Sequence, residues 1–132
     1  MACLQGPVPR MRRRAGHLIS VLLLMPSPSL AEVLSGEKIF RNQCAACHSL
    51  KADDVRVGPS LNGLAGRKAG AVPGFTYSAA LKKSRLQWNA ETLDKWLADS
   101  SAFVPGSVMS FRQADSGKRA AIITYLLDEQ AN

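Results

Sequence analysis

Two cysteines and a histidine stand together in the stretch Cys44-Ala-Ala-Cys47-His48, and this motif constrains the chain more than any other feature. Three kinds of chemistry use thiols at this spacing. A thiol–disulfide redox pair would open a helix that follows a strand, but no strand pattern precedes the motif. A structural zinc site needs four ligands, commonly in two separated pairs, and the chain has no second pair. Covalent attachment of a c-type haem is the third kind.

Haem attachment gives each residue of the motif a separate task. The thiols of Cys44 and Cys47 add across the two vinyl groups of the porphyrin, and the adjacent imidazole of His48 reaches the iron. We therefore predict one covalently bound haem c, with His48 as an axial ligand.

Residues 1–31 have the three parts of a secretory signal peptide. A basic segment at 10–14 precedes an apolar run at 18–25, and small residues precede a cut after about Ala31. The start of translation is open between Met1 and Met11. The sequence thus predicts export to the periplasm, which agrees with haem attachment after export.

A retained membrane anchor is the alternative for this segment. A spanning helix needs about 20 apolar residues. The run at 18–25 is shorter and is followed closely by Pro26 and Pro28. We expect no stable membrane insertion and one folded domain at 32–132.

Removal of the leader changes the charge argument. Four arginines leave with it while all ten acidic residues remain, so the formal net charge falls from +7 to +3. A mildly basic surface of this kind gives little support to nucleic-acid binding.

Strong iron ligands are scarce in residues 32–132. His48 is the only histidine and Met109 the only methionine of this region. Met109 is the main candidate for the sixth ligand, with a lysine or water as alternatives. His/Met ligation would leave no open position at the iron, which favours electron transfer over catalysis.

Helical patterns dominate the region, and no strand alternation of any length is present. A stretch rich in glycine and proline, residues 49–76, is too long for an unorganised loop in a small domain unless a large group is bound. The sequence predicts an all-α domain with helices at 35–47, 77–83, 88–99 and 116–129 and a loop at 100–111. The expected helix caps are Ser35, Asn89 and Ser116.

Residues 33–130 resemble the class I cytochromes c, the mitochondrial and bacterial c2-type proteins, well beyond the haem motif. This resemblance implies the cytochrome c fold, with about four short helices and long loops wrapped around one haem. The matching segments are Gly36-Glu-Lys-Ile-Phe40, Gly58-Pro59-Ser-Leu-Asn-Gly63, Gly66-Arg-Lys68, Pro73-Gly-Phe-Thr-Tyr77 and Pro105-Gly-Ser-Val-Met109-Ser-Phe111.

The resemblance also implies roles for individual residues. The Pro59 carbonyl would accept a hydrogen bond from His48, and Met109 would be the second axial ligand. Gly36 would pack against an aromatic of the last helix, here Tyr125. The remaining implied haem contacts are Arg67, Tyr77 and Trp88 at the propionates, Trp96 near the methionine face and Phe111 near the exposed haem edge.

The function implied is that of a soluble, monomeric, periplasmic electron carrier with no enzyme activity. Its partners would be a cytochrome bc1-like donor and an oxidase or a reaction centre as acceptor. Two alternatives remain: an electron-accepting subunit of one periplasmic dehydrogenase, and a ligand binder or weak peroxidase if the Met109 bond is labile.

Three positions depart from the mitochondrial pattern. Gln43 and Val108 stand where lysine is common, so the ring of lysines around the haem edge is diluted. Leu81 stands where an asparagine often holds a buried water. A partner identical to the mitochondrial one is therefore in doubt.

Overall fold

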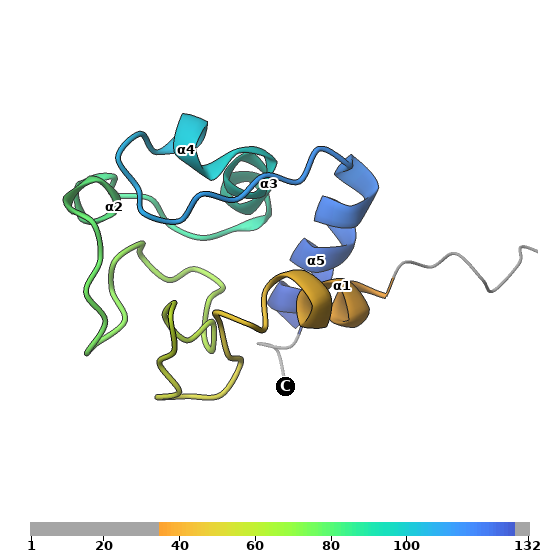
Figure 1. Ribbon diagram of the computed structural model, residues 1–132, viewed down its shortest axis with the longest axis horizontal. Helices are drawn as coiled ribbons and strands as arrows, with labels where there is room; N and C mark the ends of the chain where they lie inside the picture. Colours follow the sequence, from red (N-terminus) through yellow and green to blue (C-terminus); the bar gives the residue numbers. More distant parts are fainter. Residues whose placement is uncertain (1–34, 129–132) are drawn as a thin grey trace, which may run out of the picture. The chain divides into compact units, whose positions relative to one another are not determined.

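The structure is a computed structural model that describes residues 35–128 (Figure 1). The predicted signal peptide lies outside this part. The helices are α1 (Gly36–Gln43), α2 (Ala79–Lys83), α3 (Ala90–Ala98), α4 (Ser100–Phe103) and α5 (Ser116–Asp128). An isolated bridge between Lys68 and Gln87 is the only β pairing among the described residues. The all-α prediction is confirmed.

Two of the three expected helix caps are confirmed. The Ser35 side chain accepts the amide of Lys38 at 3.4 Å, and Asn89 forms a reciprocal capping box with Thr92. The Ser116 cap is wrong, because Asp115 occupies the position before the helix. Its carboxylate accepts the amide of Lys118 at 3.0 Å.

The ends of α2 and α3 differ from expectation by one or two residues, and two differences are larger. The first helix ends at Gln43 instead of residue 47, because the Ala45 amide bonds to the carbonyl of Phe40, five residues back, at 3.0 Å. This widened turn ends the regular helical pattern. The expected loop at 100–111 begins with α4, which Asp99 caps by accepting the amide of Ala102 at 2.9 Å.

Helix α5 is the centre of the packed scaffold, because both α1 and α3 lie against it (Figure 1). Where α1 crosses α5, a side chain at Gly36 would place its Cβ 2.6 Å from Cβ of Tyr125. The rings of Phe40 and Tyr125 meet there at a tilt, with 5.8 Å between their centroids. The crossing therefore requires glycine at position 36, and the contact implied by the resemblance is confirmed.

The loop side of the domain is held differently. Residues 66–69 pair with residues 86–88 through backbone bonds, including Gly66 N to Trp88 O at 2.8 Å and Ala69 N to Leu86 O at 2.8 Å. Figure 1 shows the chain between α1 and α2 as long loops. These loops close one side of a cavity that the helices close on the other.

Candidate haem site

A cavity of about 410 Å³ lies between the helical scaffold and the loops. Its volume falls in the range of about 300–1,000 Å³ typical of ligand and cofactor sites. All ten residues for which the sequence predicts a haem contact lie in its wall: Cys44, Cys47, His48, Pro59, Arg67, Tyr77, Trp88, Trp96, Met109 and Phe111.

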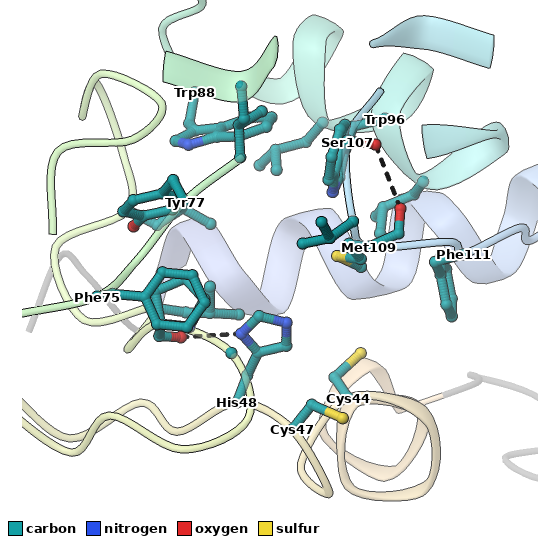
Figure 2. Close-up of a pocket in the computed structure, with 18 of the residues that line it drawn as sticks. Cys44, Cys47, His48, Phe75, Tyr77, Trp88, Trp96, Ser107, Met109 and Phe111 are labelled. Atoms are coloured by element: carbon teal, nitrogen blue, oxygen red, sulfur yellow. Dashed lines mark hydrogen bonds between the residues drawn. The ribbon is translucent and has the colours of Figure 1, made fainter. Parts of the chain in front are cut away.

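The C-x-x-C-H motif forms a compact turn directly after α1. The amides of Cys47 and His48 both bond to the carbonyl of Cys44, at 3.0 and 2.9 Å. This turn, and not a continuous helical face, brings both thiols to the cavity, where Figure 2 shows them side by side.

Burial sets the protonation state of the first thiol. Burial, and to a smaller extent the neighbouring Cys47, together raise the pKa of Cys44 to about 11. Cys44 therefore carries its proton at neutral pH in the absence of haem.

A backbone carbonyl fixes the imidazole of His48. Nδ1 lies 2.8 Å from the oxygen of Pro59, and since a carbonyl only accepts, Nδ1 carries the proton (Figure 2). Burial lowers the pKa of His48, which keeps the ring neutral. Nε2 therefore has a free lone pair, which is the form that binds a metal. The hydrogen bond to Pro59 fixes the orientation of the ring.

Gly58 makes this arrangement possible. A Cβ at position 58 would lie 2.7 Å from Nδ1 of His48, well inside van der Waals contact. The backbone therefore approaches the ring closely enough for the Pro59 carbonyl to accept a hydrogen bond from Nδ1. The sequence shows the Gly58-Pro59 pair but not this steric requirement, which appears only when the ring is placed.

Met109 enters the cavity from the segment after α4. Figure 2 shows its thioether directed toward His48, with the two side chains facing each other across the cavity. Met109 is partly buried and packs against the hydrophobic core.

Two tryptophans form the wall farthest from the thiols (Figure 2). Both are buried, and their rings meet edge to face at 5.5 Å between centroids. Neither indole N–H forms a hydrogen bond within residues 35–128, although buried donors normally find a partner. Trp88 and Trp96 therefore keep two donors in the wall of the cavity.

Arg67 and Tyr77 add polar groups to the same side. The Arg67 guanidinium donates to the carbonyls of Ser60, at 2.9 Å, and Asn62. Burial lowers its pKa and raises that of Tyr77. The wall is otherwise largely apolar.

This donor set fits haem c. The cavity offers two thiols for covalent attachment, one imidazole with an available lone pair, one thioether and unpaired indole donors in an apolar enclosure. When bound, haem c supplies a one-electron Fe(III)/Fe(II) couple.

A sequence profile of the cytochrome c family matches residues 33–129. Cytochrome c type-1 of Ascaris suum is 39% identical over 108 residues, which cover 80% of this chain and 95% of that protein. The chain belongs to the cytochrome c family. It is an electron-transfer protein of the kind that binds haem c covalently through a C-x-x-C-H motif, here Cys44-Ala-Ala-Cys47-His48.

Further relatives agree over the same region. Cytochrome c of Sesamum indicum is 41% identical over 102 residues, covering 76% of this chain and 92% of that protein. The solved structure of cytochrome cH from Methylobacterium extorquens is 44% identical, with a TM-score of 0.65, and covers 70% of this chain and 94% of that one.

Two kinds of feature are absent from residues 35–128. No helix there is long and apolar enough to cross a membrane. No group of three or more His, Cys, Asp or Glu side chains there could hold a metal ion.

Sequence reasoning missed several residues at the site. Ser100 and Ser107 bond to the backbone of the segment that carries Met109. The side chains of Gln43 and Gln113, 70 residues apart, meet at 3.1 Å. The sequence marks Gln43 as a departure from the lysine pattern, but it contains no signal that identifies Gln113 as its partner.

Proposed function

We propose that this cytochrome c carries single electrons on a haem whose iron has His48 and Met109 as axial ligands. The observation that supports this most is the placement of the two side chains, which face each other across the cavity beside both thiols (Figure 2). An iron held at both axial positions has no vacant site for oxygen or peroxide. Electron transfer then proceeds without ligand chemistry.

An optical spectrum of the oxidised protein tests this assignment. We expect the weak near-infrared charge-transfer band of a methionine-ligated ferric haem, and its loss in Met109→Ala. The reduced Met109→Ala protein should bind carbon monoxide rapidly at neutral pH, while the unsubstituted protein should not. Absence of the band from the unsubstituted protein, or rapid carbon monoxide binding by it, would refute His/Met ligation.

We further propose that residues 1–31 are a signal peptide removed after about Ala31 and that the mature domain, 32–132, works in the periplasm as a monomer. The basic, apolar and small-residue segments of the leader support this. Mass spectrometry of the haem-loaded protein from a bacterial periplasm should give an N-terminus near Glu32. A haem-loaded protein that retains residues 1–31 would contradict the proposal.

The rim of the cavity bears on its partners. Val57 and Val108 lie there with 78% of their surface exposed, and no lysine of the described region lines the cavity. The arginines that adjoin the rim in sequence, Arg56 and Arg112, pair with Asp54 and Asp99 at 3.0 and 3.9 Å. A neutral, apolar rim favours a partner whose docking face is itself weakly charged.

This rim supports both partner hypotheses to different degrees. A carrier between membrane or periplasmic redox complexes fits the family, whereas the neutral rim favours the second candidate, an electron-accepting subunit of one periplasmic dehydrogenase. Co-purification through a wash at high salt separates them. A single enzyme that stays bound identifies the subunit, and exchange among several redox complexes identifies the carrier.

A further inference from the structure

Ser100 is a serine with no exposed surface at the first position of α4. Its hydroxyl lies 2.7 Å from the carbonyl oxygen of Met109 and 3.2 Å from that of Phe111. A hydroxyl has one proton, so the shorter contact identifies Met109 as the main acceptor. The same oxygen accepts the amide of Phe111 at 2.8 Å. One buried side chain therefore holds the backbone on both sides of residue 110.

The scaffold fixes Ser100 itself. Its carbonyl accepts the amide of Val104 at 3.0 Å inside α4, and its own amide donates to the carbonyl of Phe111 at 3.1 Å. Two residues further, the amide of Gln113 donates to the carbonyl of Leu97 in α3 at 2.9 Å. Hydrogen bonds therefore connect residues 109–113 to residues 97–100. Helix α3 in turn packs on α5.

Met109 depends on this attachment because little else holds its backbone. Ser107 contributes only a long contact of 3.4 Å to the carbonyl of Met109 (Figure 2). The neighbouring positions 108 and 110 are exposed. A backbone movement that withdraws residue 109 from the cavity therefore breaks the bonds of Ser100.

We propose that Ser100 is a positioning residue that keeps the Met109 segment closed and thereby resists replacement of Met109 by external ligands. This inference rests on the proposed ligation of the iron by Met109. Opening the segment leaves a buried hydroxyl, a carbonyl and an amide without partners, and unsatisfied buried groups are unfavourable. Without the Ser100 hydroxyl, opening the segment no longer breaks these hydrogen bonds, so the open state becomes easier to reach.

The test compares Ser100→Ala with two control variants of the haem-loaded protein. Added imidazole replaces a labile methionine, and loss of the charge-transfer band reports the replacement. We expect the apparent affinity of the oxidised protein for imidazole to rise roughly tenfold in Ser100→Ala, the change typical of one buried hydrogen bond. Ser101→Ala, an exposed neighbour in the same helix, should leave the affinity unchanged.

The second control separates a local effect from general destabilisation. Ile123→Val trims the buried face of α5, away from the cavity wall, and should lower the free energy of unfolding without changing imidazole affinity. A similar rise of affinity in Ile123→Val and Ser100→Ala would overturn the proposal. An unchanged affinity in Ser100→Ala would overturn it as well.

A measurement on the unsubstituted protein covers the case in which Ser100→Ala does not fold. The Phe111 amide donates to Ser100 in the closed segment, so its hydrogen exchange should be slow and should become faster when imidazole is bound. Exchange at Phe111 that does not respond to imidazole would contradict the proposal. If the unsubstituted protein lacks the charge-transfer band, the ligation by Met109 itself fails, which is a distinct result.

Discussion

The helical scaffold and the loop side of the domain are stabilised by different means. Helices α1 and α3 both bury apolar side chains against α5, whose Ile122 is fully enclosed. Residues 49–77 form no helix or strand and contribute few core side chains, and one wall of the cavity is built from them. The scaffold buries a core of its own, whereas the loop side depends on what fills the cavity. Helices α3 and α5 form the other wall of that cavity, so its filling affects them as well.

Preventing haem attachment is the strongest way to test this difference. Without haem, the apolar side chains that line this cavity of 410 Å³ face water instead of the porphyrin. Burying one such side chain is worth about 1.5–3 kcal/mol, so several together contribute on the order of 10 kcal/mol. That is comparable with the whole stability of a small domain. We expect the double variant Cys44→Ala, Cys47→Ala, expressed without haem, to lose most of its helical circular dichroism. Native helicity and cooperative unfolding in this variant would show that the loops do not need the haem.

A substitution at the α1–α5 crossing should damage the scaffold alone. Gly36→Ala places a methyl group against Tyr125 and the backbone of Ala121, and such overpacking typically costs about 1–3 kcal/mol. The free energy of unfolding in urea should fall by the upper part of this range. The charge-transfer band of the folded protein should not change.

Gly117→Ala is the matched control for that experiment. Gly117 lies in the first turn of α5, and its added Cβ would meet only a side-chain oxygen of Asp115 at 3.2 Å. Because alanine favours helix over glycine, the control should be neutral or slightly stabilising. Equal losses in both variants would argue against the tight crossing.

A substitution at Gly58 should act on the loop side instead. The new methyl group of Gly58→Ala would meet the imidazole of His48 and separate Nδ1 from the Pro59 carbonyl. We expect a loss of about 2 kcal/mol in stability. We also expect a shift of the ring signals of His48 in the nuclear magnetic resonance spectrum of the oxidised protein. Unchanged signals would mean that the loop moves away as a unit.

A charge at the rim should give the smallest effect. Val108→Lys adds one positive charge at the cavity rim, and a unit charge about 7 Å from an anion in water contributes about 0.6 kcal/mol. Reduction by ascorbate at low ionic strength should become two- to threefold faster, with a steeper dependence on salt. Val108→Gln is the uncharged control. An equal gain in both variants would exclude a charge effect.

The sequence predicted the parts of the site that depend on local chemistry. Cys44, Cys47 and His48 are adjacent, and the Asn89 and Ser35 caps need only neighbouring residues. The cap at Asp99 is local as well, but the sequence prediction placed a loop at 100–111, with Pro105-Gly106 at its turn, and no helix after Asp99. Its sequence signal was present.

Other features could not be predicted because they arise from contacts distant in the chain. The close approach of Gly58 to the imidazole depends on the path of the loop after the motif. The bonds of Ser100 to residues 109 and 111 exist only when α4 and the Met109 segment meet. The sequence around a serine does not show whether its hydroxyl is buried and bonded to a distant segment or lies exposed on a helix.

The two exposed valines at the rim also affect the energetics of electron transfer. Water bound around ions must reorient when an electron moves, and this reorganisation is part of the barrier. A partner that covers Val57 and Val108 displaces loosely held water from apolar surface. The electron would then cross a dry contact with little solvent rearrangement, so the rim lowers the barrier to transfer without attracting the partner from a distance.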